Sequence, residues 1–159
     1  MKQDSIAIVT GASQGIGRAT AIRLAKDFSV IVLVARNGDA LKDVANAVRS
    51  SGAEPFSIAL DLSRAKSPET IVKMTLNRYK RIDALLNIAG AVPQIDLFEM
   101  IDEQWYSGME LKLHGARRLS IRAWHALKAI KGSIVLMAAP ADTESSGRRL
   151  RIQHAEFTA

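Results

Sequence analysis

The stretch that most constrains the fold is residues 10–17, which read Thr-Gly-Ala-Ser-Gln-Gly-Ile-Gly. It follows a short apolar, β-branched run at residues 5–9, the pattern of a buried strand. In residues 18–27, which come next, apolar side chains recur at helical spacing. The order is a strand, a glycine-rich turn and a helix start, which is the setting in which such a turn indicates a dinucleotide site.

Each glycine in this turn has a physical task. Gly11 permits a tight reversal of the chain, Gly15 lets the backbone approach a ligand closely, and Gly17 lets the helix pack against the strand. The free N–H groups at the helix start face whatever anion sits there, most often a pyrophosphate. Glycines also end strands for purely structural reasons, so the turn alone leaves that alternative open.

The rest of the chain alternates apolar strand patterns with helical patterns. This alternation predicts an α/β three-layer sandwich built on a doubly wound parallel sheet with right-handed crossovers. Pro55 begins one strand and favours an edge position, because proline donates no hydrogen bond to a neighbour. We expect further strands at residues 29–35, 55–60, 82–86 and 133–137, and helices at residues 39–50, 67–79 and 102–131, with Ser67 and Asp102 as caps and an interruption at Gly108 or Gly115.

The pattern divides the chain into two parts. Residues 1–137 carry the alternation and are expected to form one Rossmann-like domain. From Ala138 onward the periodicity is lost and the charges cluster, so we expect residues 138–159 to be an irregular or disordered basic tail.

Composition excludes several classes of protein. The chain has no cysteine, which excludes disulfides, thiolate catalysis and zinc–thiolate sites and favours a cytoplasmic setting. No apolar run reaches membrane-spanning length, so we expect no membrane partner. The three histidines, His114, His125 and His154, are not paired at metal-binding spacing, so no metal is expected.

The formal charge of +6 raises the question of nucleic-acid binding. Residues 1–109 hold 13 basic and 12 acidic side chains, whereas residues 110–159 hold 9 and 4. The excess therefore belongs to one late helix and the tail, and only 5% of residues are aromatic, too few for a base-stacking platform. We expect a solvated basic face and no nucleic-acid partner.

The ends of the predicted strands carry residues suited to a nucleotide. Arg36 follows the second strand, where a fold that prefers the unphosphorylated cofactor would place an acidic residue, so a 2′-phosphate is favoured. Asp61 and Leu62 follow the third strand and offer an acceptor and an apolar platform to an adenine. The alternatives are a surface cation for Arg36 and a turn or capping residue for Asp61.

These motifs, with Asn87-Ile88-Ala89-Gly90 after the fourth strand, resemble the short-chain dehydrogenase/reductase family over residues 6–137. The resemblance implies a Rossmann fold with about five strands in the order 3-2-1-4-5, lacking the family's later strands. It also implies hydride transfer between NAD(P) and an alcohol or carbonyl, with NADP(H) favoured over NAD(H). Cofactor contacts are implied for Gly11, Ser13, Gln14, Gly15, Ile16, Gly17, Arg36, Asp61, Leu62, Asn87, Ala89 and Gly90.

The family's catalytic residues are a serine, a tyrosine, a lysine one helical turn later and an asparagine on the long helix. None is in place here. Ala139, Ile152, Glu156 and Lys112 stand at the expected serine, tyrosine, lysine and asparagine positions, respectively. The chain is similar to the N-terminal part of such an enzyme, truncated before the Tyr-x-x-x-Lys motif.

Three functions follow as hypotheses. The first is an NADP(H)-type oxidoreductase by descent, inactive as this chain. The second is a catalytically dead nucleotide-binding pseudoenzyme, and the third is a basic interaction module. A homo-oligomer stays open, although the helix pair that usually forms the family's dimer interface is incomplete. The substrate cannot be read from these residues.

Overall fold

The computed structural model describes residues 4–90, 95 and 98–137. The expected tail at residues 138–159 lies outside the described residues, as do Ala139, Ile152 and Glu156.

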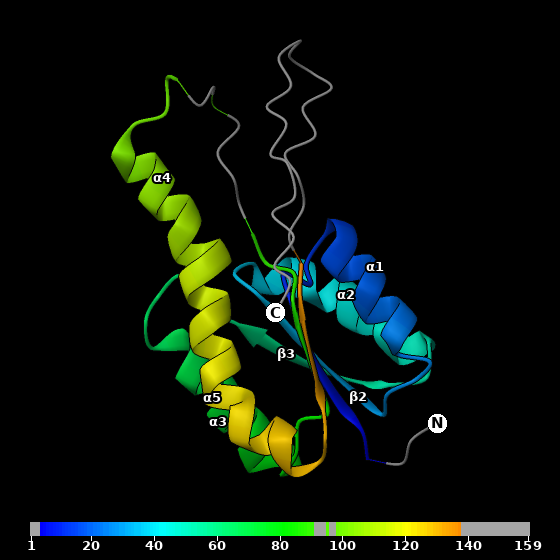
Figure 1. Cartoon of the computed structure of the whole chain (residues 1–159). Coiled ribbons are helices and arrows are strands. Elements are labelled where there is room, and N and C mark those ends of the chain that lie inside the picture. The colour runs from blue at the N-terminus through cyan, green and yellow to red at the C-terminus, as the bar shows by residue number, and fades with distance from the viewer. Residues whose placement is uncertain (1–3, 91–94, 96–97, 138–159) are drawn as a thin grey trace, which may run out of the picture.

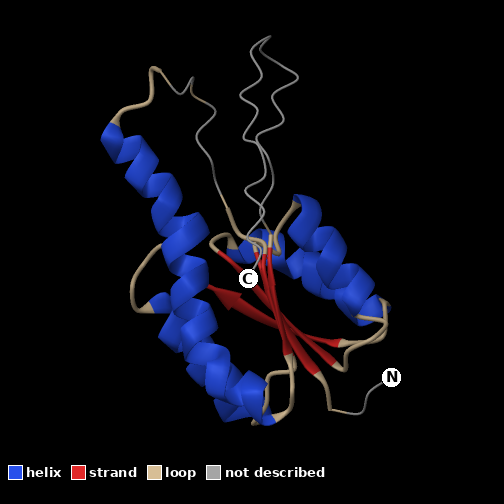
Figure 2. Ribbon diagram, viewed as in Figure 1, coloured by secondary structure: helices blue, strands red, loops and turns tan. Residues whose placement is uncertain are grey.

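A single parallel sheet forms the centre of the molecule (Figure 2). Its strands are short runs of mostly apolar residues, and two neighbouring inner strands are buried throughout, as the continuous apolar runs predict. The strands are β1 (Ile6–Thr10), β2 (Val30–Ala35), β3 (Glu54–Ala59), β4 (Ala84–Asn87) and β5 (Ser133–Leu136). Their order is β3-β2-β1-β4-β5, which confirms the predicted order 3-2-1-4-5.

Helices cover both faces of the sheet (Figure 1). They are α1 (Gly15–Leu24), α2 (Gly38–Ser50), α3 (Ser67–Tyr79), α4 (Asp102–Met109), the π-helix η1 (Glu110–Gly115) and α5 (Ala116–Ala129). Helices α1 and α2 pack on one face, and α3 and α5 pack on the other. The predicted three-layer α/β architecture is confirmed.

Side-chain alternation along β1 builds the two cores. Ile6 and Ile8 point to one face, where they join Leu119 of α5 in an apolar cluster. Ala7 and Val9 point to the opposite face, toward α1 and α2. All five residues are almost fully buried, as expected for a strand with layers on both sides.

Proline marks an edge of the sheet, as predicted. Pro55 lies in β3, which pairs with β2 in register Ile31↔Pro55 and ends the strand order on that side. An edge strand tolerates proline because the missing N–H faces away from the sheet.

Two helices start where predicted, but the residue that precedes each one is not the predicted cap. Lys66 precedes the first turn of α3, with Ser67 already helical and no side-chain hydrogen bond capping it. Ile101 precedes α4, and its backbone N–H donates to Oε1 of Gln104 at 3.1 Å. Ser67 and Asp102 are therefore first-turn residues, not caps, although Pro68 stands near the helix start as expected.

The long helix is interrupted where the chain needs a close approach. The π-helix η1 ends at Gly115, one of the two positions expected to break the helix. A Cβ on Gly115 would lie 2.8 Å from the carbonyl oxygen of Leu62, so only glycine lets the helix pass this close.

Several large apolar side chains lack cover within the described residues. Trp105, Leu113, Ile121 and Trp124 on the long helix, with Val135 and Leu136 on β5, are each about half exposed or more. Within the same residues, no helix is both long and apolar enough to cross a membrane.

Candidate functional site

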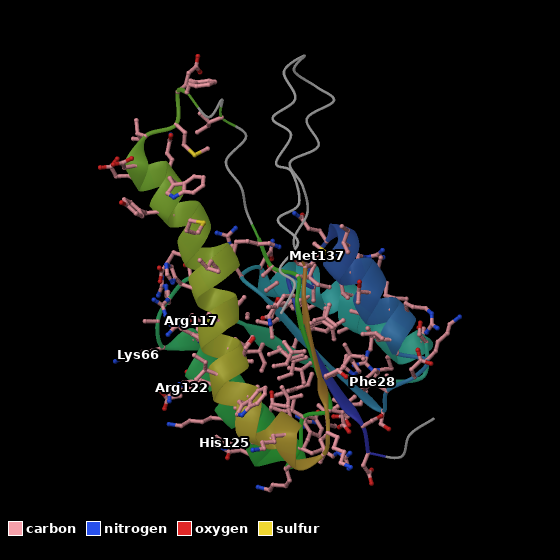
Figure 3. The ribbon with its side chains drawn as sticks, in the orientation of Figure 1. Phe28, Lys66, Arg117, Arg122, His125 and Met137 are labelled. Carbon is pink, nitrogen blue, oxygen red and sulfur yellow. The ribbon has the colours of Figure 1, made fainter. Side chains whose placement is uncertain are left out.

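A hollow of about 290 Å³ lies at the carboxyl ends of the strands. This is the edge at which open α/β sheets bind their ligands. Figure 3 places Met137, which follows β5, at this end of the sheet and Phe28, which precedes β2, at the other. The hollow is lined by Thr10, Gly11, Ser13, Gln14, Gly15, Ile16, Gly17, Val34, Ala35, Arg36, Leu60, Leu62, Ile88, Ala89, Gly90, Leu111 and Met137.

Gly11 lets the end of β1 touch the chain that follows β4. Its φ is +68°, and a Cβ there would lie 2.9 Å from Cα of Ala89 and 3.0 Å from its nitrogen. Both the positive φ and the close contact require glycine, in agreement with the tight reversal of the chain predicted at Gly11.

Thr10 fastens the same junction from beside Gly11. Its hydroxyl oxygen accepts hydrogen bonds from the N–H groups of Ile88 at 2.9 Å and Ala89 at 3.0 Å. The hydroxyl also donates to the carbonyl of Leu86 at 3.2 Å. Thr10 is fully buried, so this network sets the floor of the hollow.

The other two glycines of the turn differ in what surrounds them. A Cβ on Gly17 would lie 2.1 Å from the carbonyl oxygen of Gly11, so the helix start folds directly onto the turn. The expected packing of Gly17 against the strand is thus a contact with the turn after the strand. Gly15 has a φ of +52° and no atom within 4 Å of a Cβ, so its backbone faces open space.

The residue that precedes α1 does not cap the helix with its side chain. Gln14 precedes the helix without a side-chain hydrogen bond, and the first turn contains no acidic residue. The start of α2 is different, because Oδ1 of Asn37 accepts from the N–H groups of Asp39 and Ala40 at 3.0 and 3.1 Å. The amide groups at the start of α1 are therefore available to an anion, which the helix dipole favours there.

Arg36 and Asp61 lie near each other, but only one lines the hollow. Arg36 follows β2 and is exposed at the rim. Oδ1 of Asp61 accepts from the N–H of Ser63 at 3.0 Å and from its hydroxyl at 2.7 Å. The Ser63 hydroxyl holds the pKa of Asp61 below its ordinary value, and the charges of Arg36 and Arg64 add to this. Asp61 thus makes the turn interaction that the sequence left as its alternative.

Asn87 lies at the end of β4 and is held by a hydrogen bond to the long helix. It is almost fully buried, and its Nδ2 donates to the hydroxyl of Ser120 on α5 at 3.1 Å. Its Oδ1 accepts no hydrogen bond from the described residues. Asn87 does not line the hollow, whereas Ala89 and Gly90, which follow it, do.

Ten of the twelve predicted cofactor residues therefore line the hollow, whereas Asp61 and Asn87 do not. Sequence reasoning missed several lining residues: Thr10, Val34, Ala35, Leu60, Ile88, Leu111 and Met137. All but Leu111 lie within or directly beside the strand ends and motifs already singled out. Their closeness to the predicted strand ends could therefore have identified them from the sequence.

Residues 5–148 match the short chain dehydrogenase family. This chain belongs to that family. The chain is 30% identical over 149 residues to the short-chain reductase protein NovJ of Streptomyces niveus, a match that covers 93% of this chain and 57% of NovJ. It is 35% identical over 111 residues to a 3-oxoacyl-[acyl-carrier-protein] reductase of Synechocystis sp., covering 69% of this chain and 45% of that reductase. The chain spans about half the length of the curated relatives it matches.

Solved structures of other dehydrogenases share the fold of this chain. An alcohol dehydrogenase from the archaeon Thermococcus sibiricus, complexed with 5-hydroxy-NADP, is 34% identical with a TM-score of 0.77 over 82% of this chain and 56% of its own. NAD⁺-bound xylitol dehydrogenase is 26% identical with a TM-score of 0.81 over 90% of this chain and 56% of its own. The family binds NAD(P), and these two structures hold an NADP derivative and NAD⁺, respectively.

The long helix places Lys112 beside the hollow, next to Gly90. A Cβ on Gly90 would lie 2.8 Å from Cδ of Lys112 and 3.2 Å from its Nζ. Burial lowers the pKa of Lys112 below its ordinary value.

Polar side chains elsewhere in the described part of the chain do not form a metal site. No group of three or more His, Asp or Glu side chains within it is placed to hold a metal ion. Figure 3 shows four basic side chains on the outer side of the α3–α5 layer, away from Met137: Lys66, Arg117, Arg122 and His125.

Proposed function

We propose that the hollow binds NADP(H) and that residues 1–137 are the cofactor-binding domain of an alcohol- or carbonyl-type oxidoreductase. The observation that carries this proposal is the uncapped start of α1 beside Gly15, whose backbone faces open space. A pyrophosphate there would accept hydrogen bonds from the N–H groups of the helix start, which the side chain of Gln14 does not cap. The residues present therefore fit the dinucleotide that the family binds.

The strand order orients the dinucleotide. Arg36 follows β2 and Gly90 follows β4, and these strands flank β1 on opposite sides. With the pyrophosphate held at the start of α1, one nucleoside of the dinucleotide would lie toward the end of β2 and the other toward the end of β4. Arg36 at the rim favours a 2′-phosphate on the adenosine side, since a guanidinium binds phosphate through two parallel hydrogen bonds. Leu62, nearly buried at the same side, offers the adenine an apolar surface.

The second nucleoside then lies toward Gly90 and Met137. When bound, NADP(H) supplies the hydride exchanged with an alcohol or carbonyl. The described lining of the hollow contains no tyrosine, histidine or carboxylate that could exchange a proton with such a substrate. We therefore propose that this chain binds and orients the cofactor but does not turn over by itself.

A titration with NADPH and NADH, paired with a turnover screen over aldehydes and ketones, tests this proposal. We expect tighter binding of NADPH than of NADH and no turnover. Turnover by this chain alone would refute the claim of inactivity. Absence of nucleotide binding, together with salt-sensitive binding to polyanions, would replace the proposal with a basic interaction module.

A further inference from the structure

The π-helix η1 carries one cation, Lys112, which lies against Gly90 at the lining of the hollow. A π-turn inside an otherwise α-helical stretch is rare and is frequently found at functional sites. Here it spans Glu110–Gly115, and its far end is held against Leu62 by the lack of a side chain at Gly115. Leu111 of the same turn lines the hollow, and Lys112 comes next.

Lys112 lies across Gly90. The aliphatic stem of Lys112 is so close that a Cβ on Gly90 would meet its Cδ at 2.8 Å and its Nζ at 3.2 Å. Gly90 is itself part of the lining. The ammonium group is therefore at the β4 side of the hollow, on the opposite side of β1 from Arg36.

No acidic side chain of the described residues forms an ion pair with Lys112, whereas other lysines have such partners. Lys42 pairs with Asp39 at 2.8 Å and Lys73 with Glu69 at 2.6 Å. Lys112 is half-buried, and burial lowers its pKa, which reflects the cost of keeping a charge away from water. A partly desolvated ammonium of this kind gains most from a ligand with several acceptor oxygens.

We propose that Lys112 donates hydrogen bonds to the ribose hydroxyls of the nicotinamide half of the bound dinucleotide. The inference rests on the proposed function, because the dinucleotide must lie along the hollow with its adenosine half at Arg36. The ribose hydroxyls are the acceptors that this orientation brings toward Gly90. Lys112 is thus a cofactor-binding residue that holds the reactive end of the cofactor over β4.

Comparing two ligands distinguishes a contact between Lys112 and the nicotinamide ribose from a general effect of the lysine's charge on anion binding. NADPH contains both halves, whereas 2′,5′-ADP contains only the adenosine half with its 2′-phosphate. For Lys112→Met we expect the Kd of NADPH to rise roughly tenfold, the loss of a hydrogen bond to a charged donor, and the Kd of 2′,5′-ADP to stay unchanged. Lys128→Met is the matched control, because Lys128 is exposed on α5 of the same long helix.

Equal weakening of both ligands, or no weakening of either, would overturn the role of Lys112 while leaving the proposed function standing. Failure of the wild-type chain to bind either ligand would overturn both. Circular dichroism establishes that Lys112→Met is folded, and Lys112→Arg, which keeps the charge, should recover part of the affinity. Acylation of lysines, followed by mass spectrometry, provides a second readout. NADPH should protect Lys112 and 2′,5′-ADP should not, and equal labelling with and without NADPH would contradict the contact.

Discussion

The hydroxyl oxygen of Thr10 lies 3.0 Å from the backbone nitrogen of Ala89 and accepts its hydrogen bond, although 79 residues separate the two along the chain. The N–H of Ile88 donates to the same oxygen. One buried hydroxyl thus joins the end of β1 to the segment after β4. The floor of the hollow depends on this junction, because both sides of it belong to the lining.

Thr10→Val should destabilise the protein, because it keeps the shape of the side chain and leaves two N–H groups without their acceptor. The expected loss is about 1–3 kcal/mol in the free energy of unfolding, measured by urea denaturation. Thr70→Val is the control, since the Thr70 hydroxyl donates only to the Lys66 carbonyl on the exposed side of α3. It should cost less than about 0.5 kcal/mol. Similar losses in the two variants would contradict the role of Thr10.

Gly17 and Gly15 should respond differently to alanine. Gly17→Ala places a Cβ 2.1 Å from the Gly11 carbonyl oxygen, so the turn must move, and we expect a severe loss of stability. In Gly15→Ala the added Cβ contacts no atom, so the only cost is that alanine must adopt a left-handed backbone conformation. This lowers the free energy of unfolding by about 1–2 kcal/mol. The Gly15 variant should stay folded while its binding of NADPH weakens, because the added methyl projects into open space beside the start of α1. Thermal unfolding with NADPH titration tests the pair, and equal stability of the two variants would refute this account.

Arg36→Asp should reverse the preference between cofactors. The substitution replaces a phosphate-binding cation with a carboxylate suited to ribose hydroxyls, so we expect the ratio of the NADPH and NADH Kd values to change by at least about tenfold toward NADH. Arg49→Asp makes the same change of charge on the exposed side of α2, away from the hollow, and should leave the ratio unaltered. An unchanged ratio in Arg36→Asp would remove Arg36 from the cofactor site.

Ser63→Ala should raise the pKa of Asp61, because the Ser63 hydroxyl is the main cause of its lowered value. A carboxyl group whose folded pKa is lowered stabilises the protein above its unfolded value of about 3.8, and this contribution is lost as the pH falls through the folded pKa. The wild-type chain should therefore be more stable than the variant near pH 7, with the difference shrinking below about pH 3.8. A carboxyl titration followed by NMR measures the shift directly. An unaltered Asp61 pKa would show that another group sets it.

The order of elements could be predicted because it rests on local patterns. The apolar runs at β1 and β2 are buried on both faces, and such runs have few alternatives in an α/β chain. Pro55 identified an edge strand for the same reason, since the missing N–H is a property of the residue itself.

The roles that depend on distant partners were not accessible from the sequence. The hydroxyl of Thr10 acquires its acceptor role only when β4 lies beside β1, and Lys112 lies against Gly90 only when the long helix packs beside the segment after β4. For Asp61 the sequence left two roles open, and the hydrogen bonds from Ser63 show the turn role. The cap positions are Lys66 and Ile101, one residue before the predicted caps, because a serine or aspartate within the first turn resembles a cap in sequence.

The central claim is that a dinucleotide lies on the uncapped start of α1. An amide ¹H–¹⁵N NMR titration with NADPH tests it most directly, because each N–H reports on its own surroundings. We predict saturable shifts at Gly15, Ile16 and Gly17, with little change at Asp39 and Ala40, whose N–H groups are already bonded to Asn37. An absence of shifts at the start of α1, with shifts confined to the basic outer face of α5, would contradict the claim.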